Sequence, residues 1–144
     1  ARMVNDAQPA FVVALVERVL GPDLRGKKIA ALGMSFKPDV DDLRESPAVE
    51  VAHLLTRAGA QVTCFEPYVP QAQLNGLHTV PVLAEAVQDA DLVLLLVGHS
   101  QLRTLAPQEL AALTPARTVI DCTGAWQEPA WRAAGFTLVR LGTG

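Results

Sequence analysis

Short apolar runs that recur along the chain constrain its fold more than any other feature. In 91–97, an aspartate is followed by six apolar residues, a pattern typical of a parallel strand that is covered on both faces. Runs at 28–32, 61–65, 118–121 and 136–139 also predict strands. Segments with helical spacing separate most of these runs, so strands and helices alternate along the chain.

The expected helices account for most of the sequence between the strands. A stripe of apolar residues predicts a helix at 10–20 that ends before Gly21. Ser46 is expected to cap a second helix, which has Pro47 in its first turn and ends at Gly59. Shorter helices are expected at 82–88, 101–105, 107–113 and 127–134, and an irregular segment at 68–81.

This alternation predicts an α/β fold: a Rossmann-like, doubly wound and mostly parallel sheet with helices on both faces, preceded by an N-terminal helix. The length of 144 residues fits one domain with a substantial core. Because the chain starts at Ala1 rather than at a methionine, and a helix follows almost at once, we expect it to be a piece of a longer protein.

The composition argues against several classes of function. A net charge of −3 gives no electrostatic attraction for nucleic acid or for an anionic membrane surface. No apolar run reaches the length of a membrane span, and no signal peptide is visible. Cys64 and Cys122 lie far apart without a C-x-x-C spacing, which fits a reducing cytoplasm. His53 and His78 show no metal spacing, so no metal site is predicted.

The loop after the first strand, 33–46, is the strongest candidate for a binding site, because ligands of open parallel sheets bind beyond the carboxyl ends of the strands. It has a single glycine where a dinucleotide site has G-x-G-x-x-G. Side chains would therefore have to hold a phosphate: Lys37 as a flexible point charge and Arg44 as a bidentate fork. Phe36 is a candidate for packing against a base or a sugar.

A solvated loop explains the same charges. In that interpretation Arg44 pairs with Asp41 or Asp42, whereas in the binding-site interpretation Asp39, Asp41 and Asp42 orient the two cations or the loop itself. The residues alone leave both interpretations open.

Other strand ends carry polar residues that are expected to have structural rather than catalytic roles. Glu66 is expected to cap a helix or to face solvent before Pro67, with a ribose contact as the alternative. His99 lies on the ligand side of the sheet but has no nucleophile and carboxylate to pair with, and Ser100 is expected to be a helix N-cap.

The cysteines and tryptophans are expected to serve packing. Cys64 lies inside an apolar strand, and Cys122 follows a strand end without an activating neighbour. Trp126 and Trp131 are expected to cover the sheet edge or a partner surface.

The candidate loop resembles a known family. Its sequence and the helix start, GMSFKPDVDDLRESPAVE at 33–50, are similar to the start of the C-terminal, UDP-binding domain of the UDP-glucose/GDP-mannose dehydrogenase family. The resemblance covers essentially the whole chain, including 1–6, 65–67, 97–101 and 119–121. Within the family, DDLRESPA followed later by GHSQ is most similar to the UDP-N-acetyl-D-mannosamine 6-dehydrogenases.

The resemblance implies a complete enzyme that oxidises C6 of a UDP-sugar twice, with two NAD⁺. The catalytic thiol of such an enzyme would lie in N-terminal and central parts that this chain lacks, and Cys64 and Cys122 do not match its context. No catalytic residue is therefore assigned here, and the chain alone is expected to be inactive. Residues 1–21 would be the end of the central dimerisation helices and 22–144 the UDP-sugar-binding domain of a cytoplasmic homodimer or larger oligomer.

Three site residues follow from the resemblance. Phe36 and Lys37 match the pair that binds the UDP-sugar, and Arg44 matches an arginine that reaches the NAD⁺ held by the companion domain. The family often carries a basic residue just after the aspartate of its last long strand. Here 121–124 reads DCTG, so no substrate contact is assigned to that loop. Two alternatives remain: a UDP-glucose or GDP-mannose 6-dehydrogenase domain, or a non-catalytic nucleotide-binding module.

Overall fold

The fold is a six-stranded sheet in which every neighbouring pair of strands is parallel. The structure is a computed structural model that describes residues 8–70 and 73–140. The strand order is β3-β2-β1-β4-β5-β6. The strands are β1 (Lys28–Leu32), β2 (Gln61–Phe65), β3 (His78–Val80), β4 (Leu92–Leu95), β5 (Thr118–Asp121) and β6 (Thr137–Arg140). The predicted doubly wound parallel sheet is confirmed, and its order is that of a Rossmann fold.

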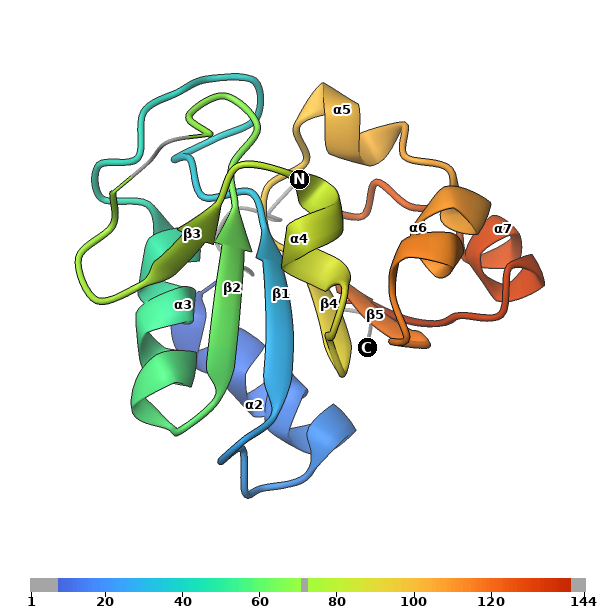
Figure 1. The fold of residues 1–144 in the computed structure, drawn as a ribbon, viewed down its shortest axis with the longest axis horizontal. Coiled ribbons are helices and arrows are strands. Elements are labelled where there is room, and N and C mark those ends of the chain that lie inside the picture. The colour runs from blue at the N-terminus through green and yellow to red at the C-terminus, as the bar shows by residue number, and fades with distance from the viewer. Residues whose placement is uncertain (1–7, 71–72, 141–144) are drawn as a thin grey trace.

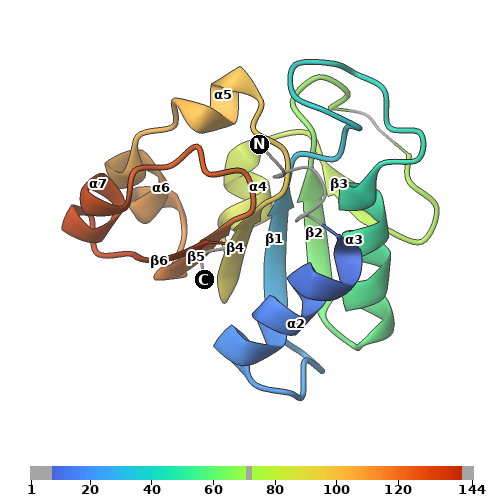
Figure 2. The ribbon, with the colours of Figure 1, turned by 180° about the vertical axis from the view of Figure 1, so that it is seen from behind.

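Helices cover both faces of the sheet. Two of them lie behind it in Figure 1 and in front of it in Figure 2: α2 (Pro9–Leu20) and α3 (Pro47–Arg57). The others pack on the second face: α4 (Leu83–Val87), α5 (Ser100–Arg103), α6 (Pro107–Leu113) and α7 (Glu128–Ala133). None of the helices in the described ranges combines the length and the apolar character that crossing a bilayer requires.

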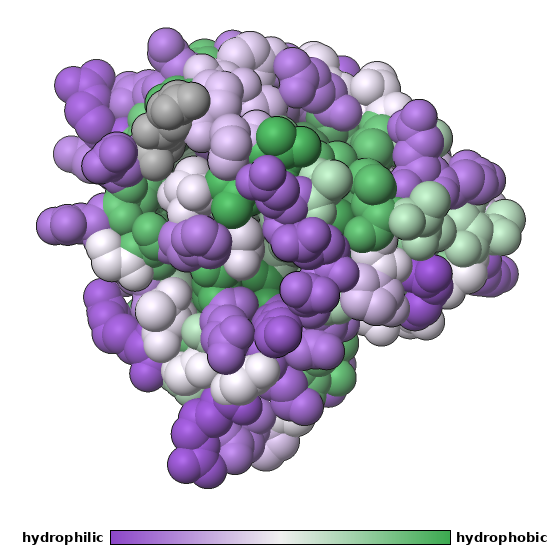
Figure 3. Space-filling model, viewed as in Figure 1, coloured by the Kyte–Doolittle hydropathy of each residue, from purple (hydrophilic) through white to green (hydrophobic). Residues whose placement is uncertain are grey.

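The strands bury both of their faces, as the apolar runs predict. In β1, Ile29 and Ala31 pack against α2 and α3, whereas Ala30 and Leu32 pack on the face of α4. All four are at most 1% exposed. The outer surface over α4 is mixed, with hydrophilic residues along most of the rim and apolar residues between them (Figure 3).

The residues around the start of α3 explain why the loop before it ends where it does. Ser46 is extended and its Oγ accepts a hydrogen bond from the amide of Ala48, as a helix N-cap does. Pro47 occupies the first turn, where its missing N–H costs no hydrogen bond. The predicted cap at Ser46 is therefore confirmed.

Two strands differ most from the predicted ones, whereas several other boundaries differ by one or two residues. The third strand in the sequence, β3, lies inside the segment predicted to be irregular. This strand has only three residues and lies at the edge of the sheet. The surrounding prolines and the Asn75-Gly76 pair are turn signals that obscure so short a strand in the sequence. Strand β4 ends at Leu95. The amides of Leu96 and Val97 both donate hydrogen bonds to the same carbonyl, that of Leu32, so the regular ladder does not continue.

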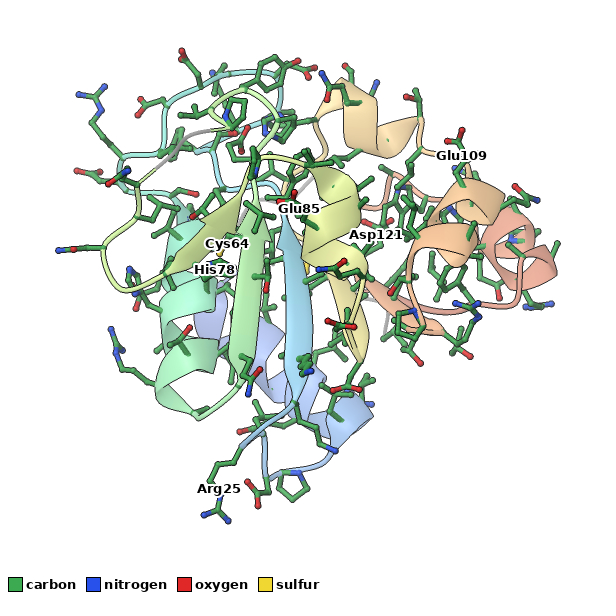
Figure 4. The ribbon with its side chains drawn as sticks, viewed as in Figure 1. Arg25, Cys64, His78, Glu85, Glu109 and Asp121 are labelled. Atoms are coloured by element: carbon green, nitrogen blue, oxygen red, sulfur yellow. The ribbon has the colours of Figure 1, made fainter. Side chains whose placement is uncertain are left out.

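The topology places the candidate loop at the switch point of the sheet. Strands β1 and β4 are neighbours, and from them the chain proceeds outward in opposite directions, through β2 and β3 or through β5 and β6. Ligands of such sheets bind at the carboxyl ends of the strands at this point. The loop after β1 and helix α5 both lie at that end, whereas Arg25, paired to Asp23, projects from the opposite end (Figures 1 and 4).

Candidate functional site

Gly33 joins β1 to the candidate loop in a conformation that only glycine adopts without strain. Its φ is +91°, and its amide donates to the carbonyl of Phe65 at 2.8 Å. A Cβ at this position would lie 2.7 Å from Val97 Cβ and 2.9 Å from the Val97 carbonyl oxygen. The glycine therefore lets the end of β1 approach the turn after β4.

The carboxylate of Glu66 holds the beginning of the loop. Its Oε1 accepts from the amides of Met34 at 2.7 Å and Ser35 at 3.0 Å, and its Oε2 accepts from the amide of Tyr68 at 2.9 Å. Burial alone would raise the pKa of Glu66, but hydrogen bonds from His99 and from these backbone amides lower that pKa below its usual value. The group is thus a buried carboxylate that stays ionised.

His99 completes this cluster and its hydrogen bonds define its tautomer. Nδ1 accepts from the amide of Asp39 at 2.8 Å, so the ring proton is assigned to Nε2. That Nε2 lies 3.0 Å from Glu66 Oε1 and 3.1 Å from Ser35 Oγ. Ser35 Oγ in turn donates to the Lys37 carbonyl at 2.7 Å. The imidazole therefore connects the loop to the ends of both β2 and β4.

Asp39 anchors the tip of the loop in a strained conformation. Its φ is +62°, which is unusual for a residue with a side chain. Its carboxylate accepts from the amide and the hydroxyl of Ser100, each at 2.8 Å, and from the hydroxyl of Tyr68 at 2.9 Å. These hydrogen bonds lower the pKa of Asp39 to about 2. We name the set Ser35, Asp39, Glu66, Tyr68, His99 and Ser100 the loop clamp.

The loop clamp leaves a three-residue segment, 36–38, between fixed points. Phe36 and Lys37 lie between Ser35 and Asp39, which are both held. The Phe36 amide also donates to the Asp42 carbonyl at 2.7 Å, and Ser46 Oγ donates to the Ser35 carbonyl at 3.0 Å. The backbone that presents Phe36 and Lys37 is therefore preorganised.

A cavity of about 420 Å³ opens beside this loop, at the carboxyl ends of β1, β4 and β5. Apolar residues form much of its wall, among them Ala48 and Val51 of α3 and Leu96 and Val97 after β4. Phe36, which is 55% exposed, stands at its edge. The space and its apolar lining suit a base and a sugar rather than a large polar ligand alone.

The charge of this cavity is positive. Lys37 and Arg103 line it, and no carboxylate does so among the described residues. Neither cation has a hydrogen-bond or ion-pair partner for its side-chain nitrogens within 8–70 and 73–140. In a chain with a net charge of −3, such a pair of free cations marks a site for an anion.

A larger cavity, of about 580 Å³, lacks the purely cationic lining of the first. It lies over the first halves of β1 and β2, and Lys28 is accompanied there by Glu85 and Asp89. Glu85 on α4 and His78 on β3, which also line it, are labelled in Figure 4. Its carboxylates and its place away from the strands' carboxyl ends make it a poor phosphate site.

The loop after β5 is fixed by a buried aspartate. Asp121 is fully buried; its Oδ1 accepts from the amide and hydroxyl of Thr123 at 2.8 Å, and its Oδ2 accepts from the amide of Trp126 at 2.8 Å. Thr123 lines the cavity, but it supplies no charge. Asp121, the last residue of β5, is labelled in Figure 4.

The three residues singled out by the resemblance do not all line the same cavity. Phe36 and Lys37 both line the cavity. Arg44 does not: its side chain is 88% exposed and pairs with Asp42 at 3.0 Å, which is the pairing that the solvated-loop interpretation expects. The structure thus brings Lys37 together with Arg103, a residue that the sequence pattern did not indicate.

Several polar residues have other roles than the predicted ones. Glu66 neither caps a helix nor faces solvent, since it is fully buried in the loop clamp. The alternative ribose contact is not supported either, because both carboxylate oxygens are bonded within the protein. Ser100 is not an N-cap: α5 begins at this residue, and its hydroxyl donates to Asp39.

The predicted packing roles are confirmed. Cys64 and Cys122 are free and buried, and burial raises the pKa of each thiol to about 12, which makes both poor nucleophiles. Trp126 and Trp131 stack with ring centroids 3.9 Å apart and are at most 2% exposed. They cover the sheet, so the alternative of a partner surface is wrong.

The chain is similar to several known nucleotide-sugar dehydrogenases. Residues 30–128 match the UDP-glucose/GDP-mannose dehydrogenase family, UDP binding domain. The UDP-N-acetyl-D-mannosamine dehydrogenase of Yersinia pestis is 39% identical over 137 residues, which are 88% of this chain and 32% of that protein. The NDP-N-acetyl-D-galactosaminuronic acid dehydrogenase of Ralstonia nicotianae is 40% identical over 131 residues, 88% of this chain and 29% of that protein.

A solved structure shows the same fold. The NDP-N-acetyl-D-galactosaminuronic acid dehydrogenase of Methanosarcina mazei Go1 superimposes with a TM-score of 0.80 at 31% identity, over 96% of this chain and 30% of that one. The chain therefore spans about a third of the length of the relatives it matches. By the match of residues 30–128, it belongs to the UDP-glucose/GDP-mannose dehydrogenase family, as its UDP-binding domain.

Proposed function

We propose that this chain is the substrate-holding domain of an NAD-dependent UDP-sugar 6-dehydrogenase that converts UDP-N-acetyl-D-mannosamine to the corresponding uronate. The observation that carries the proposal is the cavity at the switch point, which has Lys37 and Arg103 free and no described carboxylate in its lining. Such a lining suits a diphosphate, and its apolar wall suits the attached nucleoside. The names of the similar proteins favour an N-acetylated sugar over glucose or GDP-mannose.

Phe36 and Lys37 have distinct roles in this proposal. The half-exposed ring of Phe36 packs on the base or the ribose, and the ammonium of Lys37 binds the diphosphate. The loop clamp keeps their backbone in place, so little conformational entropy is lost when the ligand binds.

Arg44 is assigned to a second ligand, the NAD⁺ of the companion domain. Its side chain points to solvent and away from the cavity, which fits a contact across a cleft. Its pair with Asp42 is exposed, and exposed ion pairs contribute little to stability, so the guanidinium is released at little cost. The chain has no G-x-G-x-x-G loop of its own, so the main NAD⁺ site lies in that other domain, where the cofactor would accept the hydrides from C6.

The remaining two thirds of the protein complete the enzyme in this proposal. They supply the catalytic thiol, because Cys64 and Cys122 are buried with raised pKa values. The dimer forms through central helices of which α2 is the last part. Free cysteines and an NAD-linked reaction fit a cytoplasmic enzyme.

The proposal is tested by the sequence encoded before Ala1 and by turnover. A G-x-G-x-x-G unit and a thiol in a glycine-rich segment are expected there. The longer protein should reduce two NAD⁺ for each UDP-N-acetyl-D-mannosamine, and the chain alone should reduce none. A preceding sequence without either motif, or turnover by the chain alone above a protein-free blank, would contradict it.

A further inference from the structure

We infer that Arg103 is the second phosphate ligand of this site, taking the place of the basic residue that the loop after β5 lacks. The inference rests on the proposed function and names a residue that neither the sequence pattern nor the resemblance indicated. It starts from the charge of the cavity, where Arg103 is the one described arginine in the lining.

Arg103 is one of three described arginines, with Arg18 and Arg57, whose side chains form no hydrogen bond or ion pair in the described ranges, and of these three only Arg103 lines the cavity. Arg25, Arg44 and Arg132 form ion pairs with Asp23, Asp42 and Glu128. Arg117 donates to the carbonyls of Ala111, Thr114 and Ala116. The side chain of Arg103 has no such bond within the described part of the chain. Its five N–H donors are therefore available to a ligand.

The backbone under Arg103 is held in place although α5 has only four residues. The amide of Arg103 donates to the His99 carbonyl at 2.8 Å, and His99 belongs to the loop clamp. The indole N–H of Trp126 donates to the carbonyl of the neighbouring residue, Leu102, at 2.8 Å. Both partners are buried, so the position from which the guanidinium extends is fixed.

Arg103 supplies the positive charge of a part of the cavity wall that is otherwise uncharged. A Cβ on Gly98 would lie 3.5 Å from both Cγ and Cδ of Arg103 and 3.5 Å from Cβ of Thr123. The arginine stem and Thr123 therefore flank the same glycine. Thr123 donates its hydroxyl proton to Asp121 and carries no charge. On this part of the wall the positive charge comes from α5 instead of from the loop after β5.

A diphosphate has two anionic groups, and one lysine satisfies them poorly. Lys37 provides a compact point charge, whereas a guanidinium donates two parallel hydrogen bonds to one phosphate. None of the four acids of the loop, Asp39, Asp41, Asp42 and Glu45, lines the cavity. Asp39 and Asp42 are also bonded to Ser100, Tyr68 and Arg44. The two cations therefore act on the ligand without a competing carboxylate.

The test separates the diphosphate from the nucleoside. UDP and uridine are titrated into the chain and into Arg103→Gln, with binding followed by amide chemical shifts at millimolar ligand. Arg103→Gln should raise the Kd for UDP at least ~10-fold and leave the Kd for uridine unchanged. Arg57→Gln, an exposed arginine on α3, is the matched control and should alter neither.

The outcomes distinguish this inference from the proposed function. A UDP affinity of Arg103→Gln within twofold of the unaltered chain would overturn the inference while leaving UDP binding intact. An equal loss of uridine and UDP affinity would also overturn it, because Arg103 would then shape the cavity rather than bind phosphate. Failure of the unaltered chain to bind UDP at all would contradict the proposed function itself, and the inference with it.

Discussion

The imidazole Nε2 of His99 lies 3.0 Å from Oε1 of Glu66, and neither side chain is exposed to solvent. This contact joins the ends of β2 and β4 across the loop that follows β1, because β1 lies between these two strands. The loop carrying Phe36 and Lys37 is therefore held by buried polar groups and not by glycine amides around a phosphate.

Glu66→Gln should destabilise the fold by about 2 kcal/mol, because an amide keeps one acceptor oxygen and turns an N–H toward donors that need an acceptor. Urea denaturation measures the loss. Glu109→Gln is the matched control: Glu109 is exposed on α6 and points outward in Figure 4, so its replacement should change stability by less than ~0.5 kcal/mol. Equal unfolding midpoints for the two variants would show that the buried carboxylate does not hold the loop.

Gly33→Ala should cost more than its backbone conformation alone explains. The left-handed φ costs about 1 to 2 kcal/mol, and the contact with Val97 at 2.7 Å adds about 1 to 3 kcal/mol of overpacking. Gly135→Ala shares the positive φ, at +100°, but meets nothing within 4 Å. In thermal unfolding, Gly33→Ala should therefore have a lower Tm than Gly135→Ala. A higher Tm for Gly33→Ala would contradict the close approach at Gly33.

The sheet was predictable from the sequence because parallel strands are buried on both faces. The limits 28–32, 61–65 and 118–121 coincide with β1, β2 and β5, whose apolar runs are sharply bounded. The end of β4 was not predictable from hydrophobicity. Leu96 and Val97 are as apolar as the strand, but their amides both donate to one acceptor, the carbonyl of Leu32. Hydrogen bonding, which composition does not report, decides that boundary.

Asp39 should titrate well below an ordinary aspartate. Its pKa of about 2 results from hydrogen bonds donated by Ser100 and Tyr68, whereas in the unfolded chain it is about 3.9. Because the folded pKa is the lower one, this contribution to stability is present above pH ~4 and is lost as the pH falls toward 2. Carboxyl NMR titration should show the low midpoint, and Tyr68→Phe should raise it. A midpoint near 3.9 would mean that the tip of the loop is not anchored.

Lys37→Ala should raise the KM for the UDP-sugar at least ~10-fold in the complete enzyme that we propose, because a charge-assisted contact to the diphosphate is lost. A contact kept from ground state to transition state affects KM and leaves kcat nearly unchanged. Lys28→Ala is the control, since Lys28 is exposed at the start of β1, away from the cavity. Steady-state kinetics that show equal KM values for the two variants would remove Lys37 from the site.

The candidate site was only partly predictable. The loop motif singled out Phe36 and Lys37, and the structure has both in the lining of a cavity; their contact with a UDP-sugar stays a prediction. The partnership of Glu66 and His99 was hidden, because the two residues are 33 positions apart and meet only through the strand order β2-β1-β4. Arg103 was hidden as well, since it lies on a four-residue helix whose position depends on Trp126 and His99.

The most direct test of the central claim is a titration of the isotopically labelled chain with UDP and, separately, with GDP. We expect saturable amide shifts with UDP that are confined to 35–38, 47–51, 96–98, Arg103 and 122–125, the segments around the cavity, and weaker binding of GDP. The absence of saturable shifts with UDP at millimolar concentration, or shifts confined to the other cavity around Lys28 and Gln61, would contradict the assignment of this domain as the holder of the substrate nucleotide.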